Sequence, residues 1–454
     1  MNHPMFTYDA RMTELVLDFC RRRLALDPVP LDYGGLEPPR QGALDGLITE
    51  EGRDAEEVLG IFVDELSTSI LSTDCSRYMA FIPSAPSKAS LLFDMIVSSA
   101  AYPATSWFEA AGVVVAENQA LRCLADLAGL PDSSGGCFVA GGSAGNLSAL
   151  VVARETAAAR GGAAMHRARV AVSEEAHASV QLALRVVGME ALVVPVADHR
   201  LTGAELATAL ASNPASHDVV AVVGTAGTTN GGIVDDLAGI GAVAAEHRLW
   251  FHVDGAYGGA ALLSPGKRGL FEGISLADSL VIDPHKWLFA PYDCAALIYR
   301  DPRLASDVFT QHASYLGVMH EEDQAAEAWN PGDFAFHLTR RARGLPFWFS
   351  LAVNGLAAYR DAVERALETA RQAAVLIDEA PHLELIRPPE LSVVLFRRPG
   401  WDAAGYRAWS SELLRSQRAL VTPSAWEGEA AARFAFLHPD TSIDLVREIV
   451  DSMA

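Results

Sequence analysis

The chain has 454 residues, of which 50% are hydrophobic, and its 57 acidic and 35 basic side chains give a formal net charge of −22. A charge of this sign and size argues against binding to nucleic acid or to an anionic membrane surface. The length allows a large core and more than one domain, and no apolar run is long enough to span a membrane.

The N-terminal residues and the cysteines predict a cytoplasmic protein. The first residues carry charges where a secretory signal would have its apolar core. The five cysteines lack the spacing of a disulfide framework or a metal site, so we expect reduced thiols and no metal. They are Cys20, Cys75, Cys123, Cys137 and Cys294.

The apolar pattern divides the chain into three parts. Residues 1–77 are predicted to form two helices, the second at about 54–71, joined by a Pro/Gly-rich link. Between residues 78 and 345, apolar runs alternate with helical stretches, which is typical of a mainly parallel sheet with helices on both faces. The predicted strands are Cys137–Ala140, Arg169–Ser173, Ala191–Val196, Val219–Gly224, Leu249–Val253, Leu280–Ile282 and Ala295–Tyr299.

Residues 346–454 are predicted to form a smaller α/β domain. A long helix at about 344–374 leads into two strands, at 383–387 and 391–397, and a last helix begins at Ser442.

A turn of small residues, Gly141-Gly142-Ser143-Ala144-Gly145, lies between the first strand and an alanine-rich helix. Backbone N–H groups and the helix dipole at such a turn favour an anion, typically phosphate. Glycine turns before helices are common, and this spacing fits neither a Walker loop nor a dinucleotide fingerprint. The turn alone is therefore a weak signal.

Two charged residues follow later strands. Asp254 ends an apolar strand, and Lys286, one of only three lysines, follows another. Lysine can lose its proton when desolvated and form an imine with a carbonyl, which arginine cannot. Taken singly, Asp254 could be a structural cap and Lys286 a snorkelling side chain. Ligands collect at the carboxyl ends of parallel strands, so we expect Asp254 and Lys286 to meet at one crevice. With the Gly141–Gly145 turn beside them to bind a phosphate, they would form a pyridoxal phosphate site.

Five stretches resemble the group II pyridoxal-phosphate-dependent amino acid decarboxylases, which include aromatic amino acid, glutamate and diaminobutyrate decarboxylases. These are Gly141–Leu147, Ser173–His177, Gly227–Thr229, His252–Tyr257 and Asp283–Trp287. The resemblance implies a fold-type-I enzyme: a seven-stranded, mainly parallel sheet in residues 78–345, a small C-terminal α/β domain, and a homodimer in which residues 1–77 wrap the partner.

The resemblance also implies roles at the cofactor ring. Lys286 would form the imine, Asp254 would pair with the pyridine nitrogen, and His177 would stack on the ring. Ala256 would pack on the opposite face, and Thr229 would lie near the ring hydroxyl. The residues expected on the phosphate side are Ser143, Ala144, Gly145 and His285.

On the substrate side, the resemblance implies contacts by Phe81 and by Ser84, the latter near the substrate carboxylate. Tyr315 matches a tyrosine on a loop that is implicated in protonating Cα, where aldehyde-forming relatives tend to carry phenylalanine. The chain also departs from the family: Asp283 stands where several relatives have asparagine. Since a carboxylate near phosphate is unfavourable, we expect Asp283 to lie outside the site.

The expected reaction is α-decarboxylation of an L-amino acid to an amine and CO2, with aromatic amino acids the first choice. Thr105 and Thr339 stand where the aromatic decarboxylases have other residues, so a polar, acidic or diamino acid is an alternative. A second alternative is oxidative decarboxylation and deamination to an aldehyde on the same scaffold. A catalytically silent homologue that serves as a binding partner is disfavoured, because Lys286 and Asp254 are present.

Overall fold

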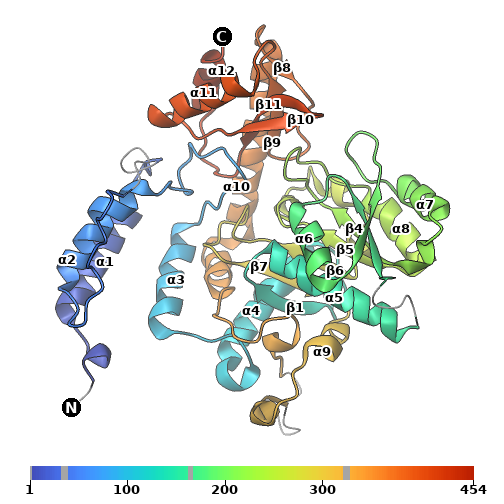
Figure 1. Ribbon diagram of the computed structural model, residues 1–454, viewed down its shortest axis with the longest axis horizontal. Coiled ribbons are helices and arrows are strands. Elements are labelled where there is room, and N and C mark those ends of the chain that lie inside the picture. The colour runs from blue at the N-terminus through green and yellow to red at the C-terminus, as the bar shows by residue number, and fades with distance from the viewer. Residues whose placement is uncertain (1–2, 32–38, 162–166, 321–327) are drawn as a thin grey trace.

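The structure is a computed structural model that describes residues 3–31, 39–161, 167–320 and 328–454, and a seven-stranded sheet forms its centre (Figure 1). The strands run in the order β1-β7-β6-β5-β4-β2-β3. They are β1 (Gly135–Val139), β2 (Arg169–Ser173), β3 (Glu190–Val194), β4 (Val219–Thr225), β5 (Trp250–Asp254), β6 (Ser279–Ile282) and β7 (Ala295–Tyr299). Only β7 runs antiparallel to the other strands of this sheet, so the predicted mainly parallel sheet is confirmed.

Helices cover both faces of this sheet, and its central strands are therefore buried throughout. On β6, Leu280 and Ile282 face one apolar core while Val281 faces the other. The helices of this part are α3 (Lys88–Ala100), α4 (Trp107–Leu127), α5 (Gly142–Ala159), α6 (Ala178–Val187), α7 (Gly203–Ser212), α8 (Leu237–His247) and α9 (Arg303–Phe309).

A smaller antiparallel sheet lies toward the C-terminus, beyond the long helix α10 (Leu345–Glu379). Its strands run in the order β10-β11-β9-β8, and two helices accompany them. They are β8 (Glu384–Leu385), β9 (Val393–Arg397), α11 (Ala403–Arg415), β10 (Pro423–Trp426), β11 (Glu429–Ala435) and α12 (Ile443–Asp451). A core of its own, with Phe396, Phe434 and Trp409, holds this part together.

The sequence analysis did not predict α11 or the β10–β11 hairpin. The hairpin turns at Glu427 and Gly428, both with positive φ, where a two-residue turn more often reads Asn-Gly. The alanine-rich sequence of β11 also has low strand propensity, and pairing with β9 overrides it.

The N-terminal helices α1 (Ala10–Leu24) and α2 (Ala55–Ile61) lie to one side of the rest of the chain and bury none of their residues (Figure 1). The second predicted helix is shorter than expected, because the chain changes to other helix types at Phe62–Leu66 and Ser67–Ser69. Among the residues that the structure describes, no helix has the length and apolarity needed to cross a membrane.

Candidate active site

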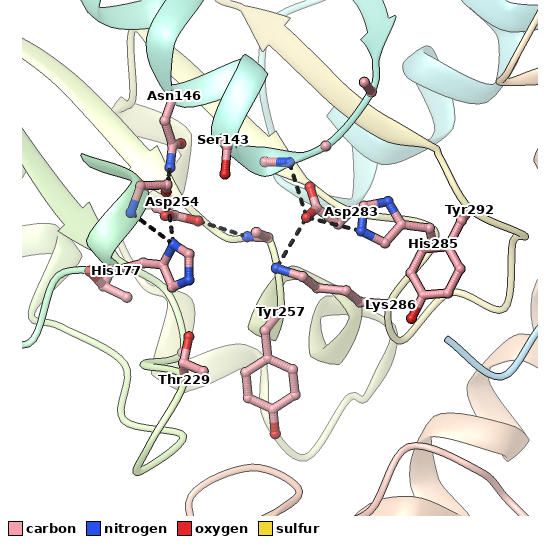
Figure 2. Close-up of a pocket in the computed structure, with 17 residues that line it drawn as sticks. Ser143, Asn146, His177, Thr229, Asp254, Tyr257, Asp283, His285, Lys286 and Tyr292 are labelled. Carbon is pink, nitrogen blue, oxygen red and sulfur yellow. Dashed lines mark hydrogen bonds and ion pairs between the residues drawn. The ribbon is translucent and has the colours of Figure 1, made fainter. Parts of the chain in front are cut away.

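A cavity of about 320 Å³ opens at the carboxyl ends of the central strands (Figure 2). Loops that follow β1, β2, β4, β5 and β6 all contribute to its wall, as the parallel topology requires. The cavity brings together seven of the residues predicted for the cofactor. They are Ser143, His177, Thr229, Asp254, Ala256, His285 and Lys286.

Lys286 points into this cavity and pairs with Asp283, whose Oδ2 lies 3.1 Å from the lysine Nζ (Figure 2). Burial lowers the pKa of Lys286, but the nearby Asp283 and Asp254 outweigh burial and leave this pKa above its usual value. The expectation of an easily deprotonated lysine is therefore wrong for this arrangement, in which the ammonium form is stabilised.

Asp283 lines the cavity, so its predicted exclusion from the site was wrong. Two groups offset its negative charge: Lys286, and the Gly142 backbone N–H, which donates at 3.2 Å; the Nε2 of the His285 ring lies 3.6 Å away. The prediction had assumed an unpaired carboxylate. Burial lowers the pKa of His285, although Asp283 opposes the shift.

Asp254 is 6% exposed and is held at both oxygens. Its Oδ1 accepts a hydrogen bond from the Ala256 backbone N–H at 3.1 Å, and its Oδ2 accepts one from the Asn146 side-chain amide at 2.9 Å. The carboxylate therefore has a fixed orientation at the wall of the cavity. Asn146 lies within the glycine turn motif, but the sequence analysis gave it no role.

His177 is the N-cap residue of α6 and leaves its ring exposed to the cavity. Its Nδ1 accepts a hydrogen bond from the Ser179 backbone N–H at 3.2 Å and lies 2.8 Å from the Ser179 hydroxyl. These two donors leave the ring proton on Nε2. The ring therefore has a donor available for a ligand.

Thr229 is fixed through its backbone. The Arg433 side chain on β11 donates from Nη2 to the Thr229 carbonyl at 2.6 Å and to the Phe81 carbonyl at 2.8 Å. Burial lowers the pKa of Arg433 to about 10, so the guanidinium stays charged at neutral pH. Phe81 thus lies beside Thr229, with 59% of its own surface exposed.

At the glycine turn, the structure separates Ser143 from its neighbours. Ser143 is exposed and lines the cavity, whereas Ala144 and Gly145 do not. Their backbone N–H groups both donate to the Gly141 carbonyl, and Gly145 packs so tightly on Val281 that a Cβ would lie 2.6 Å from it. The predicted phosphate contacts of Ala144 and Gly145 are therefore corrected to roles in the helix and its packing.

The prediction for Ser84 is also corrected. Ser84 is fully buried, its hydroxyl donates to the Ala290 carbonyl at 2.9 Å, and it does not line the Lys286 cavity. Its backbone N–H donates to the hydroxyl of Tyr292 at 3.2 Å. Tyr292 lines both this cavity and an adjoining one that includes Ser84. No sequence signal marked Tyr292, which follows Lys286 in an irregular loop.

The other substrate-side predictions have different outcomes. Tyr315 belongs to the 3₁₀ segment Ser314–His320, but its side chain lies outside the described residues. Thr105 and Thr339 do not line the cavity.

The donor set fits pyridoxal phosphate. Lys286 supplies an amine, Asp254 a buried anion for a ring nitrogen, and Ser143 with the α5 N-terminus a set of phosphate contacts. His177 and Thr229 add exposed polar groups at the same wall. These features define a pyridoxal-phosphate site on a fold of the type-I class.

Comparisons with known proteins agree with a pyridoxal-phosphate site. The pyridoxal-dependent decarboxylase conserved domain matches residues 42–398, and the chain belongs to this family. It is 32% identical to an aromatic-L-amino-acid decarboxylase of Bacillus atrophaeus over 77% of this chain and 73% of that protein. It is 31% identical to an L-2,4-diaminobutyrate decarboxylase of Rhizobium meliloti over 80% of this chain and 74% of that protein.

The fold has solved counterparts. The structure of Oryza sativa TDC with pyridoxal phosphate (PLP) and tryptamine superposes with a TM-score of 0.90 at 23% identity, covering 100% of this chain and 99% of that one. The predicted family, fold class and cofactor are thus confirmed: the protein is a pyridoxal-phosphate-dependent amino acid decarboxylase.

Proposed function

We propose that this protein decarboxylates an aromatic L-amino acid to the corresponding amine. The observation that carries the proposal is the convergence of Lys286, Asp254, His177 and Thr229 on one cavity. Each residue has the chemistry that the cofactor needs, and each is fixed by the strand end or loop that bears it.

When bound, pyridoxal phosphate supplies an electron sink for the pair of electrons left by the departing carboxylate. The chain's own residues would prepare this step. Lys286 would hold the cofactor until the substrate amine takes its place, and Asp254 would pair with the ring nitrogen. His177 would contact the cofactor from the same wall, with its Nε2–H available as a donor to the substrate.

An aromatic substrate is supported by two observations. Tyr292 places an exposed aromatic ring in the cavity wall, which suits a planar substrate. Phe81 does not line the cavity, but it is exposed and its backbone shares the Arg433 donor with Thr229. The argument for a polar substrate rested on Thr105 and Thr339, which lie away from this cavity. Relatives that act on aromatic amino acids include the Bacillus atrophaeus enzyme and tryptophan decarboxylase 1 of Oryza sativa.

The alternatives are also represented among the relatives, by the L-2,4-diaminobutyrate decarboxylase of Rhizobium meliloti and by phenylacetaldehyde synthase of Arabidopsis thaliana. The cofactor-loaded protein should be incubated with aromatic, acidic and diamino acids, and the products identified by mass spectrometry. We expect an amine from an aromatic substrate and none from the Lys286→Ala variant. An amine only from a diamino or acidic substrate would overturn the substrate class, and an aldehyde would overturn the product.

We further propose a cytoplasmic homodimer with domains at residues 1–77, 78–345 and 346–454. One protomer exposes large apolar side chains on α10 and on the two helices that pack against it, α3 and α4. They are Leu92, Ile96, Phe108, Val115, Val353 and Leu356. Exposed apolar side chains on neighbouring helices favour association. Sedimentation equilibrium should give twice the chain mass, and a monomer across micromolar concentrations would contradict the proposal.

A further inference from the structure

A chain of buried polar side chains runs behind Asp254, on the sheet face that α5 covers. Asn146 on α5, His252 on β5 and Ser279 on β6 are each 0–1% exposed. His252 and Ser279 are direct neighbours in the β5–β6 pairing. Polar groups buried to this degree cost stability unless all their hydrogen bonds are made, so packing alone does not explain them.

The donors along this chain can be assigned without ambiguity. The Asp254 carboxylate only accepts, so the Asn146 amide nitrogen donates to it at 2.9 Å, and the Asn146 oxygen must then accept from His252 Nε2, also at 2.9 Å. With its proton on Nε2, His252 accepts at Nδ1 from the Ser279 hydroxyl at 2.8 Å.

The chain ends at Trp250, whose indole N–H only donates and lies 2.8 Å from the Ser279 oxygen. Every hydrogen bond from Trp250 to Asp254 therefore donates in the same direction, toward the carboxylate. Burial lowers the pKa of His252 to about 4, so the ring is neutral and keeps this one tautomer at physiological pH.

Asn146 also serves a second residue of the site. Its amide nitrogen lies 3.1 Å from the Ser179 hydroxyl oxygen, and the Ser179 hydroxyl in turn donates to His177 Nδ1. The Asn146 side chain thus contacts Asp254 directly and His177 through one serine, and both are among the residues expected at the cofactor ring (Figure 2). Alanine-rich α5 offers no other side chain within the cavity wall that could do this.

We propose that Asn146 is a positioning residue that keeps the Asp254 carboxylate aimed at the pyridine nitrogen, and that His252 and Ser279 hold Asn146 in the required orientation. The inference rests on the proposed pairing of Asp254 with that nitrogen. Loss of the Asn146 donor should weaken the contact specifically where the ring carries a nitrogen.

The test compares the affinity of cofactor-stripped protein for pyridoxal phosphate with its affinity for the 1-deaza analogue, which has C–H in place of the ring nitrogen. In the Asn146→Leu variant the ratio of the two affinities should fall about tenfold, the value of one hydrogen bond to a charged acceptor. Affinity for the deaza analogue should stay within about twofold of that of the unaltered protein.

Ser279→Ala removes only the hydroxyl that donates to His252, and it should lower the ratio of the two cofactor affinities by a smaller factor. If Asn146→Leu fails to fold, the Ser279→Ala result is the test of the inference. Ser148→Ala is the matched control, because this buried α5 serine donates to its own helix at the Ala144 carbonyl. Its ratio should be unchanged.

If the folded variant loses affinity equally for pyridoxal phosphate and for the deaza analogue, the inference about Asn146 is overturned. The proposed cofactor site itself would still stand. If the unaltered protein itself fails to prefer pyridoxal phosphate over the deaza analogue, then the pairing of Asp254 with the ring nitrogen is wrong, and the inference falls with it.

Discussion

Asp283→Asn tests how the charge of Lys286 is controlled. The substitution keeps the size of the side chain and an oxygen that can accept from the Gly142 N–H, but it removes the negative charge beside the lysine. Only a neutral amine attacks a carbonyl, so the variant should bind an aldehyde at Lys286 faster at neutral pH.

The magnitude follows from the 3.1 Å separation of Nζ and Oδ2. Coulomb's law at this distance gives about 1 kcal/mol in bulk water and about 5 kcal/mol at an effective dielectric constant of 20. The Lys286 side chain is 23% exposed, so water screens the pair, and we take the lower end of this energy range, about 1 kcal/mol. The neutral fraction of Lys286, and with it the attachment rate, should then rise roughly five- to tenfold.

The assay is stopped-flow mixing of cofactor-stripped protein with pyridoxal, followed by the visible absorbance of the attached aldehyde. Pyridoxal lacks the phosphate, so a change in phosphate repulsion cannot produce the result. Asp293→Asn is the control, because this carboxylate pairs with Arg343 at 2.7 Å rather than with the lysine. Equal rates for the unaltered protein and Asp283→Asn between pH 6 and 8 (about one unit either side of neutrality) would refute the reasoning.

Burial raises the pKa of Glu117 from 4.5 to about 7, because it outweighs the Gly344 N–H, Arg340 and Arg343, which all lower this pKa. The native state then keeps a proton that the unfolded chain loses, so stability should fall by about 3 kcal/mol as pH rises from about 4.5 to 7. Glu117→Gln should remove this dependence of unfolding free energy on pH, measured by urea titration at several pH values. An unchanged pH dependence would mean that another group causes it. Gly145→Ala should cost about 1–3 kcal/mol of unfolding free energy, whereas Gly269→Ala, with no atom within 4 Å of its Cβ, should unfold at nearly the original urea concentration. In air, Tyr315→Phe should shift the products from amine towards aldehyde and ammonia, with dioxygen as the oxidant and hydrogen peroxide as its product; unchanged amine output would remove the proposed role of Tyr315.

The central sheet and the cofactor wall could be predicted because their signals are local in sequence. Asp254 and Lys286 each follow an apolar strand directly, and parallel topology then brings the strand ends together. All seven predicted strands are present, two of them with the predicted bounds. Nothing comparable marks the β10–β11 hairpin, whose turn lacks the usual residues and whose strand β11 depends on pairing with β9, more than 30 residues earlier.

Side-chain direction was the main source of error within the site. Ser84 occupies the predicted loop, but its hydroxyl turns toward the Ala290 carbonyl. Asp283 was excluded on the assumption that it lacked a partner, and its partner proved to be Lys286. Asn146 faces inward, toward Asp254, a direction that depends on the rotation of α5 against the sheet.

The position of Arg433 has a consequence for biosynthesis. This residue follows Thr229 by 204 residues and Phe81 by 352, yet its side chain donates to the backbone carbonyls of both. A ribosome-bound chain therefore lacks this support until β11 has emerged, long after the residues of the cavity wall. A chain that stops before β11 would leave both carbonyls without this donor.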